Sequence, residues 1–155
     1  MEQFKRALAT SFRILSKKAY SRHEIEQKLI KFEYDEEIVE QVLAKLEEMK
    51  LVDDEEYADI IIEGYTQKGW GKQKIREELY KRGVPSDISK EKLTDYDADY
   101  DVILKHYENK LRGDISEYKN VEKAKAFLYR KGFSFDEIST GYLLYKEKLE
   151  DSECL

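Results

Sequence analysis

Apolar residues recur along this chain at intervals of three and four, which is the period of an amphipathic α-helix. Between residues 2 and 17 the apolar positions are Phe4, Leu8, Phe12 and Leu15. Similar stretches follow to the end of the chain, and no stretch alternates apolar and polar residues long enough to predict a strand. The pattern therefore predicts an all-α protein built from short helices.

Signals for helix starts divide the pattern into segments. Ser21 with Glu24 and Ser134 with Glu137 each have the spacing of a capping box, and Asp53 is placed to cap a third helix. The acidic segment 94–101 (TDYDADYD) is a candidate for either a flexible joint or a cluster of helix-starting residues. The helix after residue 35 is expected to turn Ile38, Val42, Leu43, Leu46 and Met49 inward.

The helical pattern repeats with a period near fifty residues. Residues 79–84 (LYKRGV) and 128–133 (LYRKGF) share a phrase in which two basic residues precede a glycine. Apolar anchors recur at the same period, so that Leu29, Leu79 and Leu128 occupy equivalent positions. Such coincidences predict tandem three-helix repeats at 1–50, 51–97 and 98–155, about nine helices in an elongated, curved, solenoid-like array.

Composition narrows the functional classes. The 155 residues carry a net charge of −6, which argues against a general nucleic-acid coat. The chain has neither an apolar run of membrane-spanning length nor a secretory signal, so we expect a cytoplasmic protein without a membrane partner. The single cysteine, Cys154, cannot form an internal disulfide and is expected to be incidental.

No group of residues in the sequence predicts catalysis. The two histidines lack metal-ligand spacing, and the acidic clusters at 35–37 and 53–56 stand where carboxylates offset a helix dipole. The pair Gly69 and Gly71 lacks the remaining residues of a phosphate loop. We therefore expect a protein that is not an enzyme, with no catalytic residue, no cofactor and no metal site.

The candidate binding surface is basic. Residues 68–82 carry six Lys or Arg against two Glu, a local charge of +4 in an acidic chain. The candidate contact residues are Tyr65, Trp70, Lys72, Lys74, Arg76, Lys81 and Arg82, together with Arg130 and Lys131 of the repeated phrase. Aromatic residues with arginine are typical anchors of protein interfaces. The alternatives are a merely solvated helix and, for Trp70, a hydrophobic staple against Ile75.

These features resemble the RecX family of RecA regulators. The resemblance covers almost the whole chain and rests mainly on the segment LVDDEEYA, the glycine turn before the second helix of the middle repeat, and the endings KRGV and RKGF. It implies a non-catalytic protein that lodges in the groove of RecA–DNA filaments and suppresses ATP hydrolysis and strand exchange. We expect the protein to be a monomer. Roles in DNA repair, recombination and the SOS response come with it.

Two positions depart from the family pattern. Where the family usually carries arginines late in the leading helix of the middle repeat, this chain has Glu63 and Tyr65. Contact with RecA is thus favoured over direct DNA binding, which is expected to be weak. Two other functions stay open: a helical nucleic-acid-binding protein that acts without RecA, and a helical scaffold for an unrelated partner.

Overall fold

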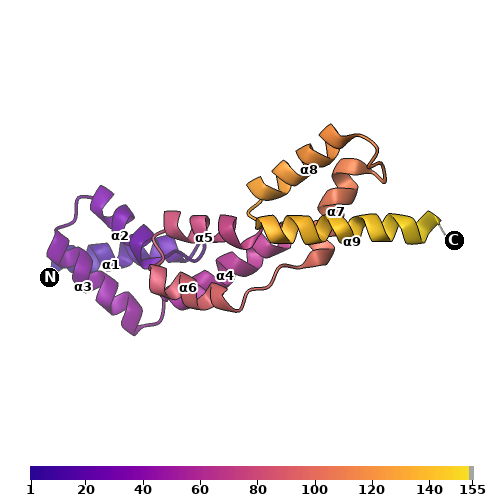
Figure 1. Ribbon diagram of the computed structural model, residues 1–155. Helices are drawn as coiled ribbons and strands as arrows, with labels where there is room; N and C mark the ends of the chain where they lie inside the picture. The colour runs from indigo at the N-terminus through magenta and orange to yellow at the C-terminus, as the bar shows by residue number, and fades with distance from the viewer. Residues whose placement is uncertain (154–155) are drawn as a thin grey trace. The chain divides into compact units, whose positions relative to one another are not determined.

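A computed structural model describes residues 1–153, which form nine α-helices and no strand (Figure 1). The helices are α1 (Glu2–Leu15), α2 (Arg22–Lys31), α3 (Glu36–Glu48), α4 (Asp54–Gln67), α5 (Lys72–Lys81), α6 (Ser86–Thr94), α7 (Tyr100–Leu111), α8 (Tyr118–Arg130) and α9 (Phe135–Glu153). The prediction of an all-α chain of consecutive three-helix groups is confirmed. We call α1–α3, α4–α6 and α7–α9 the first, second and third modules. Cys154 lies outside the described residues.

The chain packs as two compact units. The first unit consists of Met1–Ile62 and Glu78–Thr94, and the second of Glu63–Glu77 and the described residues from Asp95 on. Residues of the middle module therefore contribute to both units. The predicted repeat boundaries at 50/51 and 97/98 stay a prediction. Within residues 1–153, no helix is long and apolar enough to cross a bilayer.

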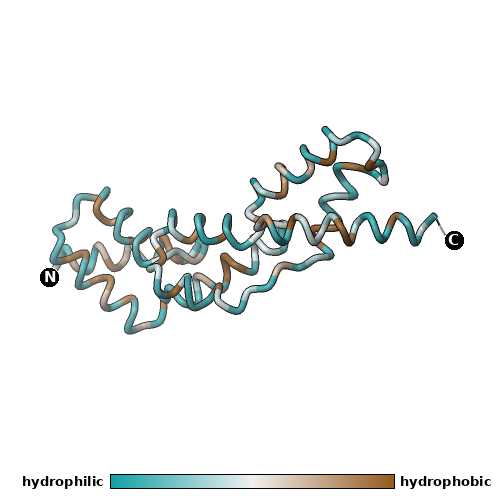
Figure 2. Tube along the Cα trace, viewed as in Figure 1, coloured by the Kyte–Doolittle hydropathy of each residue, from teal (hydrophilic) through white to brown (hydrophobic). Residues whose placement is uncertain are grey.

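The core of the first module forms where the apolar sides of α1, α2 and α3 meet. Ile25, Leu29 and Leu43 are fully buried there. Figure 2 shows apolar positions alternating with polar ones along each helix, as expected for amphipathic helices. The prediction for Met49 was wrong, because this residue is 45% exposed and Val39 is buried in its helix instead. Met49 follows the last turn of α3, immediately before Lys50 at φ 60°, where the helix has ended.

Helix starts form as the local sequence predicts. Ser21 Oγ accepts the Glu24 N–H at 3.1 Å, and the Glu24 carboxylate accepts the Ser21 N–H at 2.9 Å. Ser134 and Glu137 make the same reciprocal pair at 3.1 and 2.8 Å. Asp53 accepts the N–H groups of residues 55 and 56. The three predicted caps are confirmed, and each satisfies N–H groups that a helix leaves unpaired.

Arg22 ties the start of α2 to its surroundings in the first unit. Its guanidinium donates to Glu47 at 2.5 Å and to Glu40 at 2.9 Å, and the hydrogen bond to Glu47 raises the pKa of Arg22. Its backbone N–H donates to Asp54 Oδ1 at 2.9 Å. Burial raises the pKa of Asp54, so the ionised carboxylate is desolvated in the folded chain.

The third module closes around two tyrosines in the second unit. Tyr107 and Tyr145 stack with ring centroids 5.7 Å apart, and the Tyr107 hydroxyl donates to the carbonyl of Ile138 at 2.8 Å. Tyr145 donates to Glu108 and accepts from the N–H of Gly113, which fastens the end of α7 to α9. At the start of α7, Asp99 accepts the Asp101 N–H, so this part of the acidic segment does serve as a helix-start signal.

Candidate partner-binding surface

The glycine turn that joins α4 to α5 is shaped by backbone conformation and close packing. Gly69 has φ +84°, and the N–H of Trp70 returns to the carbonyl of Tyr65 at 3.0 Å, which closes the end of α4. A Cβ at Gly69 would lie 2.8 Å from His106 Nε2. This nitrogen lies 2.9 Å from the Gly69 carbonyl oxygen, so only glycine fits both the dihedral and the contact.

Three of the predicted residues come together at this turn. The rings of Tyr65 and Trp70 stack with centroids 4.0 Å apart, and Lys74 Nζ lies 3.9 Å from the centre of the indole. A further lysine, Lys68, lies 4.7 Å over the Tyr65 ring. The two rings and Lys74 are half-buried and Lys68 is exposed, so cations and aromatic rings are stacked together just before and at the start of α5.

The backbone of the repeated basic-basic-glycine phrase is in contact with the start of another helix. In the second unit, the Gly71 N–H donates to the Lys131 carbonyl at 2.6 Å and the Gln73 N–H donates to the Gly132 carbonyl at 3.1 Å. A Cβ on Gly132 would lie 2.5 Å from the backbone nitrogen of Lys74. The start of α5 therefore packs against the turn that follows α8 and is hydrogen-bonded to it.

The first unit contains the equivalent contact. Ser21 Oγ, at the start of α2, donates to the Arg82 carbonyl at 2.5 Å, and a Cβ on Gly83 would collide with His23. Position 21 corresponds to 71, and position 82 to 131, in the repeat. We call each contact a module joint. The recurrence of the phrase is explained by these joints, in which its carbonyls and glycine, rather than its cations, make the contact.

Arg82 has a structural position. Its side chain donates to Glu78 at 2.9 Å and to the hydroxyl of Tyr57 at 2.7 Å, and only 24% of it is exposed. Burial raises the pKa of Tyr57 to about 12. The guanidinium therefore ties α5 to α4 within the first unit.

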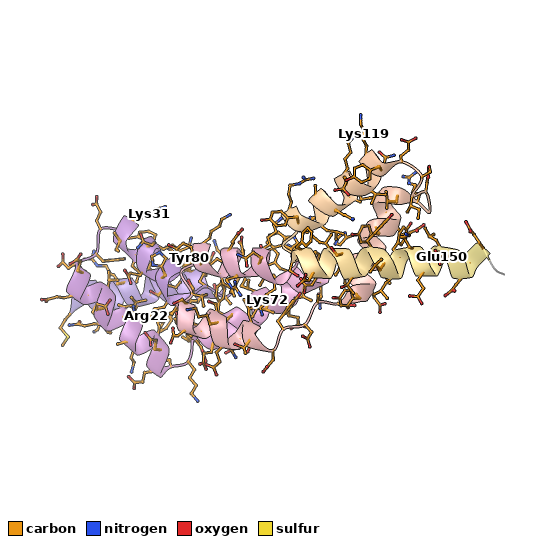
Figure 3. The ribbon with its side chains drawn as sticks, in the orientation of Figure 1. Arg22, Lys31, Lys72, Tyr80, Lys119 and Glu150 are labelled. Atoms are coloured by element: carbon orange, nitrogen blue, oxygen red, sulfur yellow. The ribbon has the colours of Figure 1, made fainter. Side chains whose placement is uncertain are left out.

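The other predicted cations are more accessible. Arg76 and Lys81 are exposed on α5, with Arg76 donating to Gln73 at 3.0 Å, and Lys72 is half-buried. Figure 3 marks Lys72 at the beginning of α5. In the third module, Arg130 is exposed and Lys131 lies 5.4 Å from the Phe127 ring centre.

Two tyrosines were missed by the sequence prediction. Tyr80 is 82% exposed and Tyr129 is 70% exposed, although large aromatic rings are usually at least partly buried. Each follows a fully buried leucine and precedes an exposed cation, as Tyr80-Lys81 and Tyr129-Arg130. The available signal was their common register in the repeat, one residue beyond a core position. Figure 3 shows Tyr80 projecting from the end of α5.

Candidate metal ligands are dispersed. Residues 1–153 contain no group of three histidine, cysteine, aspartate or glutamate side chains that could hold a metal ion. His106 instead contacts the rings of Phe127 and Phe133 edge-on, at 5.5 and 6.0 Å between centroids. The candidate surface described above therefore consists of cations and aromatic rings on helices or directly beside them.

The fold defines a tandem three-helix repeat protein, and the exposed candidate contact residues Arg76, Lys81 and Arg130 lie on its middle helices α5 and α8. The chain belongs to the RecX family. Models of the RecX first, second and third three-helix domains match residues 7–46, 53–93 and 97–140, one for each module. The resemblance drawn from the sequence is confirmed, and the protein is a regulatory protein of this family.

Relatives and solved structures agree with this assignment. The regulatory protein RecX of Chlorobium phaeobacteroides is 33% identical over 83% of this chain and 86% of its own length. The regulatory protein RecX of Pelodictyon phaeoclathratiforme is also 33% identical, over 89% of this chain and 88% of its own length. The crystal structure of RecX from Lactobacillus salivarius has the same fold, with a TM-score of 0.86 over 94% of this chain and 97% of that one, at 23% identity.

Proposed function

We propose that this protein modulates RecA: it binds in the groove of RecA–DNA filaments and inhibits ATP hydrolysis, recombinase activity and strand exchange. Membership of the RecX family across all three modules supports this function. In this proposal the protein acts as a monomer in the cytoplasm, without a cofactor and without catalysis of its own. Its effect is to restrain recombination and DNA repair.

The observation that carries the proposal is the exposed aromatic ring between cations on α5. Tyr80 lies one residue before Lys81 and four residues after Arg76, and all three side chains are exposed. Tyrosine and arginine are enriched at interface hot spots, because they offer large contact area together with hydrogen-bonding groups. The equivalent pair Tyr129 and Arg130 supplies a second contact, so binding to a filament of identical subunits gains from multivalency.

The test reverses accessible charges and leaves Arg82 unchanged, since Arg82 holds α5 on α4. The variant Arg76→Glu with Lys81→Glu should require roughly tenfold more protein for half-inhibition of the DNA-dependent ATPase of RecA. Each exposed ion pair is worth about 0.2–1 kcal/mol, and reversal adds repulsion to the loss. The matched control, Lys90→Glu with Lys148→Glu, changes the same charge at exposed positions on α6 and α9.

Two results would contradict the proposal at different levels. Full inhibition by the folded Arg76 and Lys81 variant would exclude this face of α5 as the contact. Failure of the unmodified protein to co-sediment with RecA–DNA filaments would exclude RecA as the partner. Titration into labelled DNA without RecA, at two salt concentrations, separates a direct DNA-binding function, which weakens steeply with salt.

A further inference from the structure

A basic cleft lies in the first unit, where the ends of α1 and α2 meet. Its volume is about 480 Å³, within the size range of ligand-binding pockets. It is lined by Arg13, Ile14, Lys17, Lys28, Lys31 and Phe32. We call it the α1–α2 cleft. It is separate from the residues of α5 discussed above and contains none of the predicted contact residues.

The cations of the α1–α2 cleft lack acidic partners among the described residues. None of the ion pairs within residues 1–153 involves Arg13, Lys17 or Lys31. Lys28 lies 5.0 Å from the ring centre of Tyr20, a contact that keeps its charge available. One cation at a helix end offsets the helix dipole, whereas here four cations line one cleft, three from α1 and α2 and Lys17 from just after α1. Their mutual repulsion is relieved when an anion binds between them.

The cleft also offers an apolar surface. Ile14 is half-buried, and Phe32 is 51% exposed, directly after the last turn of α2. The Phe32 ring is tilted against Tyr34 at 6.2 Å between centroids, and about half of the residue remains exposed. A ligand with both carboxylates and a large apolar side chain therefore satisfies the charge and the apolar surface together.

The sequence around the cleft favours a short anion over a long one. Residues 5–31 carry eight basic and two acidic side chains, whereas residues 32–48 carry one basic and seven acidic. Four of these acids, at positions 33, 35, 36 and 37, lie within five residues of Phe32, which is at most about 18 Å of chain. A nucleic-acid strand that extends from the cleft past these four acidic residues places its phosphates close to negative charge. A short acidic peptide ends within the basic region.

We propose that the α1–α2 cleft binds an acidic segment of a partner protein. Two or more carboxylates of that segment contact the lysines and Arg13, and one large apolar side chain packs on Ile14 and Phe32. This inference goes beyond the proposed function, because it concerns a different module and can be measured without RecA. Its failure would leave inhibition of RecA through α5 untouched.

The third module contains a second basic cleft that can be compared with the α1–α2 cleft. A cleft of about 340 Å³ between α7 and α8 is lined by three cations, Lys110, Lys123 and Arg130, and by Phe127. There the Phe127 ring is already occupied, because Lys110 Nζ lies 4.0 Å from its centre and His106 contacts it edge-on. This cleft has one cation fewer than the α1–α2 cleft, and its ring is already in contact with other side chains, so we expect it to bind an acidic peptide more weakly.

The probe is a fluorescein-labelled peptide, Asp-Glu-Asp-Phe-Glu-Asp-Glu, titrated with the full chain in 50 mM salt and followed by fluorescence anisotropy. The double variant Lys28→Glu with Lys31→Glu should weaken binding at least about tenfold, since two contacts become repulsive. Phe32→Ala should weaken it by roughly three- to tenfold through loss of apolar contact area. Replacing the phenylalanine of the peptide by alanine should have a similar effect.

Matched controls separate this site from general charge attraction. Lys5→Glu with Arg6→Glu alters two exposed cations of α1 outside the cleft and should leave peptide affinity within about twofold. Circular dichroism confirms that each variant is folded. The proposal is overturned if the peptide does not bind at concentrations of the unmodified chain up to about 1 mM, or if the Lys28 and Lys31 variant binds as well as the control. Tighter binding of an oligothymidylate of equal charge, lost in the same variant, would also overturn it and assign the cleft to nucleic acid.

Discussion

The module joint of the second unit makes a quantitative prediction for Gly71→Ala. A Cβ at position 71 would lie 2.5 Å from the Gly132 carbonyl carbon and 2.6 Å from both the Gly132 oxygen and the Phe133 nitrogen. All three are backbone atoms, so no side-chain rotation can relieve the clash. Overpacking of this kind costs about 1–3 kcal/mol.

Movement of the helix start away from the clash has a further cost. It stretches the hydrogen bonds from Gly71 to Lys131 and from Gln73 to Gly132, each worth about 1 kcal/mol. Partial loss of both bonds adds about 1 kcal/mol, so the total destabilisation is about 2–4 kcal/mol, a large share of the 5–15 kcal/mol typical of a folded protein. In urea denaturation this corresponds to a midpoint lower by about 1–2 M.

Two probes follow this unfolding. Far-UV circular dichroism reports all helices, and fluorescence reports the joint itself, because Trp70 is the single tryptophan and precedes Gly71 directly. The matched control is Gly64→Ala within α4, where a Cβ would meet nothing within 4 Å. Alanine there should stabilise the protein by about 0.5–1 kcal/mol through its higher helix propensity. A Gly71→Ala protein as stable as the unmodified chain, with unchanged Trp70 emission, would refute the joint as a close-packed contact.

Three further predictions concern single side chains. Tyr145→Phe should lower the free energy of unfolding by about 1–3 kcal/mol in thermal or urea denaturation, because the Gly113 N–H loses its acceptor and Glu108 its donor. The free energy of unfolding should fall as the pH rises from 10 to about 12, because burial raises the pKa of Tyr57 and Tyr145 to about 12. These hydroxyls ionise first in the unfolded chain, which is thereby favoured. Tyr145→Phe should make the fall in stability smaller. Asp54→Asn keeps an acceptor for the Arg22 N–H and removes a desolvated charge. Because the folded pKa of Asp54 is raised, its ionisation costs stability as pH rises above its ordinary value of 3.8, so the asparagine variant should gain relative to the unmodified chain between acid and neutral pH.

The features that sequence predicts well are those encoded by neighbouring residues. The capping boxes at Ser21 and Ser134 join residues three apart, so their spacing alone specifies the contact. The repeat can be predicted because its core leucines recur at a constant spacing near fifty residues. The family resemblance follows from the same contiguous phrases, and the comparisons confirm it.

The features that sequence missed depend on distant partners. Arg82 and Lys81 read alike in the chain, yet Arg82 is held by Tyr57, 25 residues away, whereas Lys81 is exposed. The first fifty residues carry ten basic and ten acidic side chains, so their overall charge conceals the α1–α2 cleft. Gly141 lies inside α9, and a Cβ there would lie 2.4 Å from Cγ2 of Ile103 on α7. Such roles appear only when the helices are packed.

The module joint has two unlike sides, the start of one middle helix and the end of another. A contact between unlike surfaces is not self-complementary, so a module that offers both surfaces leaves one of them open for a further module. The turn after α2 retains a left-handed residue at the equivalent position, Glu33 at φ 65°, although no helix start within residues 1–153 donates to its carbonyl. A designer could therefore add a module whose middle helix starts against this turn, after replacing Glu33 by glycine to admit the incoming backbone.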